Sequence, residues 1–155
     1  MTPLFKKMNF KEHEAIYVLH APDSFLPELK EMGKSTTVKT SLKGAKNIPF
    51  FIGFVTNQKE VDELTQAIGA IARTDEVIWF AYPKGTSKKY TCEFNRDTGW
   101  KELGKLGFEG VRMVAIDEDW SALRFRRVEN IKTMKRSFAM SKEGKAKVKK
   151  TLKKE

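Results

Sequence analysis

The run DEDWSALR, which begins at Asp117, holds the greatest density of reactive side chains in this chain. On a strand, successive side chains face opposite sides of the sheet, so Trp120 and Arg124 share one face and Ser121 lies on the other. No Ser-His-Asp order or nucleophile elbow accompanies Ser121. Two interpretations follow: Asp117 and Trp120 contribute to a ligand site, or Trp120 belongs to the core and Arg124 pairs with Asp117 or Asp119.

The loop after the apolar run EVIWFAY holds the second candidate site. Pro83 breaks that run, Gly85 lets another group approach the backbone closely, and Lys84 and Ser87 bring an ammonium group and a hydroxyl. Such donors suit a carboxylate or a phosphate. Loops rich in glycine and lysine are also common as solvated turns, so both interpretations of Lys84 stay open.

The glycine-rich loop with which many α/β proteins bind phosphates does not follow the first apolar run of this chain. The chain reads LHAPDSF at that place, where Pro22 lacks an N–H donor, and no glycine occurs between Ala15 and Met32. Neither a dinucleotide fingerprint nor a phosphate loop is therefore expected there. The cofactor, if there is one, stays unknown.

Cysteine and histidine counts restrict the chemistry further. Cys92 is the only cysteine, and His13 and His20 are the only histidines, which excludes an intramolecular disulfide and a zinc site built on several cysteines. We expect no metal site. No apolar stretch approaches the ~18 residues of a membrane span, and no signal peptide is visible, so we expect a soluble, cytoplasmic protein without a membrane partner.

Apolar periodicity predicts the strands that position these residues. Six segments are expected to form strands: residues 15–21, 36–42, 48–56, 76–82, 111–116 and 120–126. The first, third and fourth are continuous apolar runs typical of buried strands. The second alternates weakly, as an edge strand does, and the last two are separated by a hairpin-length connection.

Three helices are expected between these strands. Asp23 or Ser24 is expected to cap the first helix. Asn57 is expected to cap the second, because Glu60 three residues later completes a capping-box pattern. Asp97 is expected to cap a short third helix, and this structural role competes with a role as a catalytic carboxylate.

Strands that alternate with amphipathic helices predict an α/β, Rossmann-like three-layer sandwich, with a mainly parallel mixed sheet and an antiparallel C-terminal hairpin. Ligands of such sheets bind outside the carboxyl ends of the strands. The candidate ligand-binding residues are those that follow strands: Lys84, Ser87, Asp117, Trp120, Asp23 and Asn57.

Positive charge is concentrated at the C-terminal end of the chain. Residues 132–155 hold ten basic and two acidic residues, which accounts for +8 of the net charge of +10. We therefore expect one Rossmann-like domain over residues 1–131 and a basic, flexible tail over residues 132–155. The tail either binds nucleic acid by neutralising phosphates or stays solvated. Its nucleic-acid candidates are Lys135, Arg136, Lys145, Lys147, Lys149 and Lys150.

Three segments carry a resemblance to a known family: VIWFAYPKGTS, NRDTGW and VAIDEDWSALRFRR. Together they resemble an uncharacterised bacterial domain-of-unknown-function family whose fold is similar to a reduced, methyltransferase-type Rossmann domain. The resemblance covers roughly residues 4–131. The positions that match its signature, without assigned roles, are Pro83, Lys84, Trp120, Ser121 and Arg124. LHAPDSF departs from the glycine-rich, acidic loop with which a methyltransferase holds S-adenosylmethionine.

These observations favour a small-molecule or protein-binding module with its site at the strand ends around Lys84 and without recognisable catalytic machinery. The first alternative is a divergent S-adenosylmethionine-type transferase, which rests on the resemblance. The second is nucleic-acid association through the basic tail. Whether the chain is an enzyme is left open by the sequence.

Overall fold

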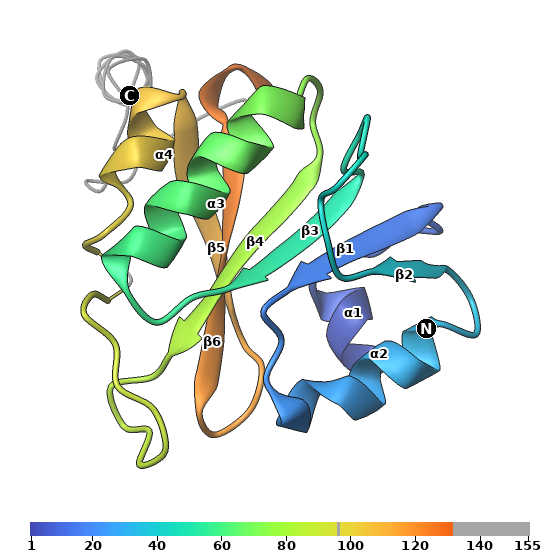
Figure 1. Cartoon of the computed structure of the whole chain (residues 1–155), viewed down its shortest axis with the longest axis horizontal. Helices are drawn as coiled ribbons and strands as arrows, with labels where there is room; N and C mark the ends of the chain where they lie inside the picture. Colours follow the sequence, from blue (N-terminus) through green and yellow to red (C-terminus); the bar gives the residue numbers. More distant parts are fainter. Residues whose placement is uncertain (96, 132–155) are drawn as a thin grey trace, which may run out of the picture.

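Six strands form one mixed sheet in the order β2–β1–β3–β4–β6–β5 (Figure 1). The computed structural model describes residues 1–95 and 97–131. The strands are β1 (Ala15–Leu19), β2 (Thr37–Lys39), β3 (Phe50–Phe54), β4 (Val77–Pro83), β5 (Phe108–Ala115) and β6 (Trp120–Arg127). The α-helices are α1 (Pro3–Lys7), α2 (Leu26–Met32), α3 (Gln58–Ile71) and α4 (Lys101–Lys105), and short 3-10 helices are η1 (Asp23–Phe25) and η2 (Val128–Asn130). The predicted α/β class with a mainly parallel mixed sheet is confirmed.

The parallel part of the sheet consists of β2, β1, β3 and β4. Every residue of β3 and of β4 is buried. Continuous apolar strands of this kind are expected where helices cover both faces of a parallel sheet. β2 is short and partly exposed and pairs only with β1, so the weak alternation in this part of the sequence correctly predicted an edge strand.

The antiparallel part of the sheet is the hairpin of β5 and β6. β6 pairs with β5 on one side and with β4 on the other, so it lies between them. The expected antiparallel hairpin is confirmed, and its insertion beside β4 is a tertiary feature that local patterns do not encode. The register shifts between Gly110 and Arg112. Val111, the extra residue at this bulge, packs against Val128 and Ile131.

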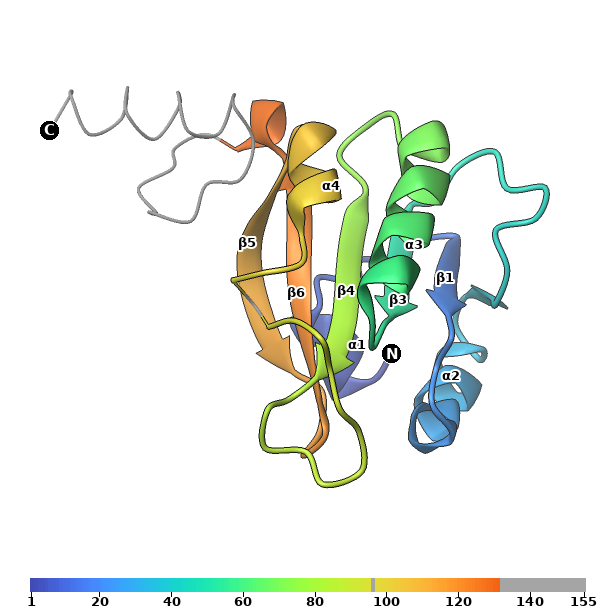
Figure 2. The same cartoon turned by 60° about the vertical axis from the view of Figure 1, so that its left-hand side comes forward.

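Helices cover both faces of the sheet and make three layers (Figure 2). On one face, Phe5 of α1 and Leu29 of α2 pack in one cluster with Trp79 of β4. On the other face, Ile68 of α3 and Leu103 of α4 belong to a second cluster. The sequence did not predict α1, whose five residues are too few for a helical period to show.

The predicted cap of α3 is confirmed. Asn57 is the N-cap, and its side chain accepts the amide hydrogen of Glu60 at 2.9 Å. The carboxylate of Glu60 returns to the chain, where its Oε1 accepts from the Thr56 amide at 2.9 Å, the Thr56 hydroxyl at 3.0 Å and the Asn57 side-chain amide at 3.1 Å. This reciprocal arrangement satisfies N–H groups that have no partner inside the helix.

The other two predicted caps are wrong. Asp23 and Ser24 lie within η1, and neither η1 nor α2 has a side-chain capping hydrogen bond. α4 starts after Trp100, later than expected, and Asp97 does not cap it. Gly99 has a φ of 90°, which no right-handed helix contains, so the helix cannot begin before it.

Candidate ligand-binding site

The carboxyl ends of β1, β3 and β4 point toward one end of the molecule, which we call the carboxyl edge; it lies toward the bottom of Figure 1. The loop of residues 84–95 and the turn between β5 and β6 lie at the same end. The chain leaves β1 toward α2 on one face and leaves β3 toward α3 on the other. The topological switch point of the sheet therefore lies between β1 and β3, where ligands of open α/β sheets commonly bind.

Lys84 and Ser87 belong to a loop that is fastened to the β5–β6 turn. The amide of Lys84 donates to the carbonyl of Asp119 at 2.8 Å, and the hydroxyl of Ser87 donates to the Asp119 carboxylate at 2.8 Å. The amide of Tyr90 donates back to the Ser87 hydroxyl at 3.1 Å. The only hydroxyl hydrogen of Ser87 is committed to Asp119, so Ser87 positions the loop and has no hydrogen left for a ligand.

A cavity of about 270 Å³ lies beneath this loop. Its walls are Tyr82, Pro83, Lys84, Gly85, Ser87, Tyr90, Thr91, Cys92, Phe94 and Asn95. Lys84 is the only charged residue among them. Within residues 1–95 and 97–131, the Lys84 ammonium group has no hydrogen bond or ion pair, so its charge is available at the cavity.

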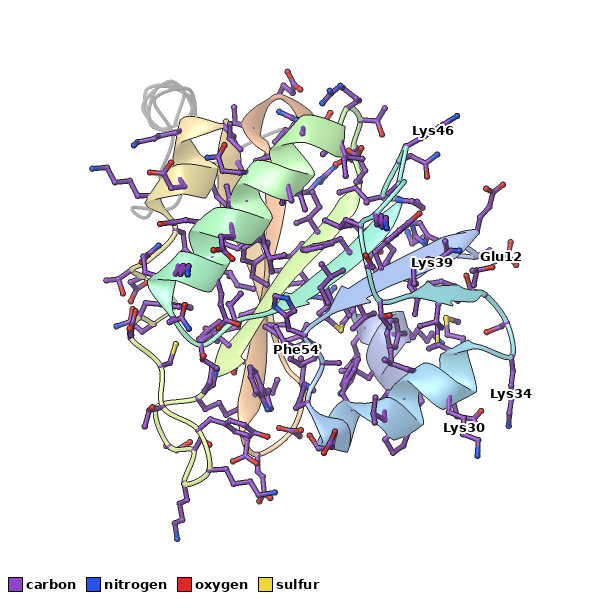
Figure 3. The ribbon with its side chains drawn as sticks, in the orientation of Figure 1. Glu12, Lys30, Lys34, Lys39, Lys46 and Phe54 are labelled. Carbon is purple, nitrogen blue, oxygen red and sulfur yellow. The ribbon has the colours of Figure 1, made fainter. Side chains whose placement is uncertain are left out.

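Asp117 and Trp120 do not line this cavity. The carboxylate of Asp117 accepts from the amides of Asp119 and Trp120, both at 2.8 Å, and so closes the hairpin turn. Trp120 is 3% exposed and packs against Phe54 and Tyr90 with ring centroids 5.1 and 4.9 Å apart. Figure 3 shows Phe54 at the end of β3. The structure thus brings Lys84 and Ser87 together and places Asp117 and Trp120 in the supporting turn and core.

Arg124 does not pair with Asp117 or Asp119, so this expectation is wrong. It lies opposite Trp79 of β4 and Arg112 of β5. Arg124 lies on β6, five residues beyond Asp119 in the turn, and at about 3.3 Å per residue the two backbones lie about 16 Å apart. A side chain on the strand cannot span that distance to its own turn.

Asn57 lies at the switch point, but its amide is already used in the cap of α3. Next to it, Nδ1 of His20 lies 3.7 Å from a carboxylate oxygen of Glu60. His20 has a φ of 61°, in the left-handed region that a residue with a side chain seldom adopts. Asp23 is exposed at the start of η1. His20, Asn57 and Glu60 therefore form a polar group separate from the cavity at Lys84.

Two residues that were not among the predicted ligand-binding residues hold the carboxyl edge together. Asp119 fastens the loop of residues 84–95, and Glu93 accepts the amide hydrogen of Gln58 at 2.9 Å and joins the loop to α3. Asp119 stands in the turn of the predicted hairpin, which is the only local signal for its role. No local pattern indicates the role of Glu93, because its partner Gln58 is 35 residues away in the sequence.

Cys92 lies at the wall of the cavity as a free thiol. Burial raises the pKa of Cys92 and the charge of Glu93 acts in the same direction, while a backbone hydrogen bond from Phe94 opposes them. The nearby Lys88 and Lys89 therefore do not produce a low thiol pKa. Because the thiolate is the nucleophile, the raised pKa disfavours a catalytic cysteine here.

Other common sites have no counterpart in the part of the chain that the structure describes. Among residues 1–95 and 97–131, no group of three or more histidine, cysteine, aspartate or glutamate side chains is arranged to hold a metal ion. None of the helices in these ranges has the length and apolar character needed to cross a membrane. The tail candidates Lys135, Arg136, Lys145, Lys147, Lys149 and Lys150 lie outside the described residues.

Comparison with solved structures shows the fold. A SAM dependent methyltransferase from Aquifex aeolicus matches with a TM-score of 0.52 and 13% identity, over 79% of this chain and 87% of that chain. A protein in the NADB-Rossmann superfamily from Streptococcus agalactiae matches with a TM-score of 0.47 and 12% identity, over 82% of this chain and 68% of that chain. No family model and no curated protein matches the sequence. The fold is therefore a methyltransferase-like Rossmann fold.

The residues at the carboxyl edge do not fit the nucleoside cofactor that such a fold implies. After β1 the chain passes through His20 and Pro22 into η1, without a glycine loop and without a full helix N-terminus directed at the strand end. In Rossmann folds an acidic residue about 20 positions beyond that loop binds the ribose hydroxyls. Here the corresponding strand, β2, ends at Lys39, and no acidic residue occurs between Met32 and Lys59.

Proposed function

We propose that this chain is a small-molecule-binding module that holds an anionic ligand in the cavity beneath residues 84–95, with the Lys84 ammonium group as the charged contact. The observation that carries this proposal is an unpaired ammonium group at the wall of a preformed cavity that is otherwise lined by uncharged groups. In such a setting a lysine binds a carboxylate or phosphate as a point charge.

The cavity limits the size of the ligand. At about 30 Å³ for each water molecule, its 270 Å³ would hold about nine waters. This lies below the usual range for cofactor pockets, which begins at about 300 Å³. The rings of Tyr82 and Phe94 at the wall favour a ligand with a small apolar or aromatic body. We expect compounds of the size of benzoate or glycerol 3-phosphate.

The test is a titration of the full chain with acetate, benzoate, inorganic phosphate and glycerol 3-phosphate, followed by amide NMR spectra. We expect at least one probe to shift the amide signals of Lys84, Gly85 and Phe94 saturably. Lys84→Met should weaken that probe at least tenfold, because it keeps the stem and removes the charge.

Lys88→Met is the matched control, since Lys88 belongs to the same loop but does not line the cavity. It should leave the affinity within twofold of the unaltered chain. Equal losses for the two variants would show an effect of overall charge and would overturn the proposal, as would the failure of all four probes to shift these amides.

A divergent transferase that binds S-adenosylmethionine is the second candidate, and the fold shared with a SAM dependent methyltransferase is what supports it. The same carboxyl edge would have to hold the nucleoside without the glycine loop and acidic residue discussed above. Calorimetric titration with S-adenosylmethionine and with its demethylated product tests this candidate. Absence of heat at millimolar ligand would eliminate it.

Nucleic-acid association through residues 132–155 is a third candidate, supported by the concentration of +8 in this segment. The full chain and a chain ending at Asn130 would be compared in gel-shift assays with DNA and RNA at 50 and 200 mM salt. If the tail binds phosphates, only the full chain shifts the probe, and the shift weakens steeply with salt. Equal binding by both chains would exclude this role.

A further inference from the structure

Two arginines face each other across the β5–β6 hairpin. Arg112 and Arg124 are direct cross-strand partners and share the face of the sheet on which Trp120 and Ala122 belong to the α1 and α2 core. Like charges in directly opposite positions destabilise a sheet. An anion bound between the two guanidinium groups would offset this repulsion.

A third arginine on this face already has its counterion. Arg126 lies two residues beyond Arg124 and donates to the Asp75 carboxylate through both Nε, at 3.0 Å, and a terminal guanidinium nitrogen. Neither Arg112 nor Arg124 has such a partner within residues 1–95 and 97–131. Of the three arginines on this face, Arg126 thus has a counterion, and Arg112 and Arg124 have none among the described residues.

The side chain of Arg124 contains a buried donor without an acceptor. Its Nε is buried and has no hydrogen-bond partner among the described residues. Burial lowers the pKa of Arg124, the neighbouring charges of Arg126 and Arg112 lower it further, and Asp75 opposes them. A buried N–H group without an acceptor is costly.

His13 offers a third donor on the same face of the sheet, where its ring packs against Phe50 of β3. Its Nδ1 accepts the amide hydrogen of Lys11 at 3.1 Å, so the ring hydrogen of the neutral imidazole resides on Nε2. Burial lowers the pKa of His13, and the charges of Arg124 and Lys11 lower it further. No acceptor for Nε2 lies among the described residues.

The segment that carries His13 is held firmly in place. The indole of Trp79 donates to the carbonyl of Met8 at 2.9 Å, and the Thr36 hydroxyl donates to the carbonyl of His13 at 2.7 Å. The imidazole packs against the rings of Phe10 and Phe50, with centroids 5.5 Å away in each case. A ligand donor on this segment therefore has a fixed position.

Charges of both signs surround the two arginines that lack a counterion. The cationic groups are Lys11, Arg112, Arg124 and Arg126, and the anionic groups are Asp75, Glu109, Glu12 and Glu14. Asp75 is bound to Arg126, and Glu109 is fully buried opposite Arg126 with an interaction of its own. Glu12 and Glu14 are exposed on the two sides of His13.

We propose that Arg112, Arg124 and His13 form a phosphoryl-binding site on this face of the β5–β6 hairpin. Guanidinium groups bind phosphate oxygens with two parallel hydrogen bonds, and two arginines with one imidazole N–H supply the donors that such a group accepts. The phosphoryl group belongs either to a small phosphate ester or to a phosphodiester backbone. Arg124 lies four residues along β6 from Trp120 at the carboxyl edge, about 13 Å away, so this site is independent of the Lys84 cavity.

The test follows the arginine Nε–H and histidine ring signals of the full chain by NMR during titration with pyrophosphate, at an ionic strength held constant with sodium chloride. We expect saturable shifts of the Arg124 Nε–H and His13 signals. Arg112→Ala, a change at an exposed position that leaves the core intact, should weaken pyrophosphate at least tenfold.

Lys46→Ala is the matched control because it removes one positive charge from the distant β2 side of the molecule (Figure 3). It should change the affinity by less than twofold. Equal losses for Arg112→Ala and Lys46→Ala, or the absence of shifts at Arg124 and His13 at 50 mM pyrophosphate, would overturn the proposal. Arg124→Gln is a further variant, expected to abolish the His13 shift.

A second titration with a 12-nucleotide single-stranded DNA distinguishes the two sources of the phosphoryl group. Tighter binding than pyrophosphate, with the same tenfold loss in Arg112→Ala, identifies a phosphodiester backbone. If pyrophosphate binds and Arg112→Ala leaves the affinity for the DNA unchanged, the site binds a small phosphate ester. Lys84→Met does not alter this site. A negative result with pyrophosphate at the arginines is therefore distinct from a negative result at the Lys84 cavity.

Discussion

Replacement of Glu60 provides the sharpest test of how the switch point is built. Glu60→Ala removes the carboxylate of Glu60. Its Oε1 accepts hydrogen bonds from the Thr56 amide, the Thr56 hydroxyl and the Asn57 side chain. The substitution also removes a negative charge from the first turn of α3, where the helix dipole favours one. We therefore expect a large loss of stability from a single surface-facing residue.

The size of the loss follows from these contacts. A hydrogen bond to a charged group contributes about 1.5–3 kcal/mol, and a charge at a helix N-terminus about 0.3–1 kcal/mol. The side chain of Glu60 is 30% exposed, so water replaces part of what is lost. We expect Glu60→Ala to lower the free energy of unfolding by about 2–3 kcal/mol. Glu60→Gln keeps an accepting oxygen and should lower it by about 0.5–1 kcal/mol.

The assay is urea unfolding followed by circular dichroism and by the fluorescence of the three tryptophans. Glu63→Ala is the control on the same helix, because the Glu63 side chain is 64% exposed and its one contact is with Lys59 at 3.9 Å. An exposed pair of this kind is worth about 0.3–0.5 kcal/mol. If the loss for Glu60→Ala lies within 0.5 kcal/mol of the loss for Glu63→Ala, the Glu60 carboxylate does not stabilise the start of α3, and the reasoning is refuted.

Three further predictions concern Cys92, the loop of residues 84–95 and the half-buried His13. Because burial raises the pKa of Cys92, its alkylation by iodoacetamide at pH 8 should be several-fold slower than that of a cysteine in a peptide, and the rate should still rise above pH 9. Ser87→Ala should cost about 1 kcal/mol and accelerate hydrogen exchange at the Tyr90 amide, while unchanged exchange would mean that the Asp119 contact does not hold the loop. The pKa of His13 is lowered by folding, so the unfolded chain binds more protons below about pH 6.5 and the free energy of unfolding should fall from there as the pH drops; His13→Gln should flatten this slope in urea unfolding between pH 7.5 and 5.

Sequence patterns predicted most of the helices and strands, because residues close together in the sequence determine whether such an element forms. β3 and β4 are apolar at nearly every position, which indicates strands covered on both faces. α3 shows a helical period over fourteen residues and a capping pattern at Asn57. α1 has only five residues, and no period can be seen in so short a segment.

Two of the failed predictions share one cause, which is that the partner of a side chain was inferred from nearness in sequence. Arg124 was expected to pair with an aspartate of its own turn, but the strand carries it about 16 Å away to Arg112. Asp97 was expected to cap the next helix, but the positive φ of Gly99 delays that helix until after Trp100. In both cases backbone geometry a few residues away decided the outcome.

The sequence by itself determined the fold class, the missing glycine loop after the first strand, and the separation of a nearly neutral body from a basic C-terminal segment. These depend on residue type and period alone. The tertiary structure decided which polar groups meet: Lys84 with a cavity, Ser87 with Asp119, and Arg112 with Arg124. The insertion of β6 between β4 and β5 produces that last pair, because cross-strand neighbours are set by the order and register of the sheet and not by the chain that leads to them.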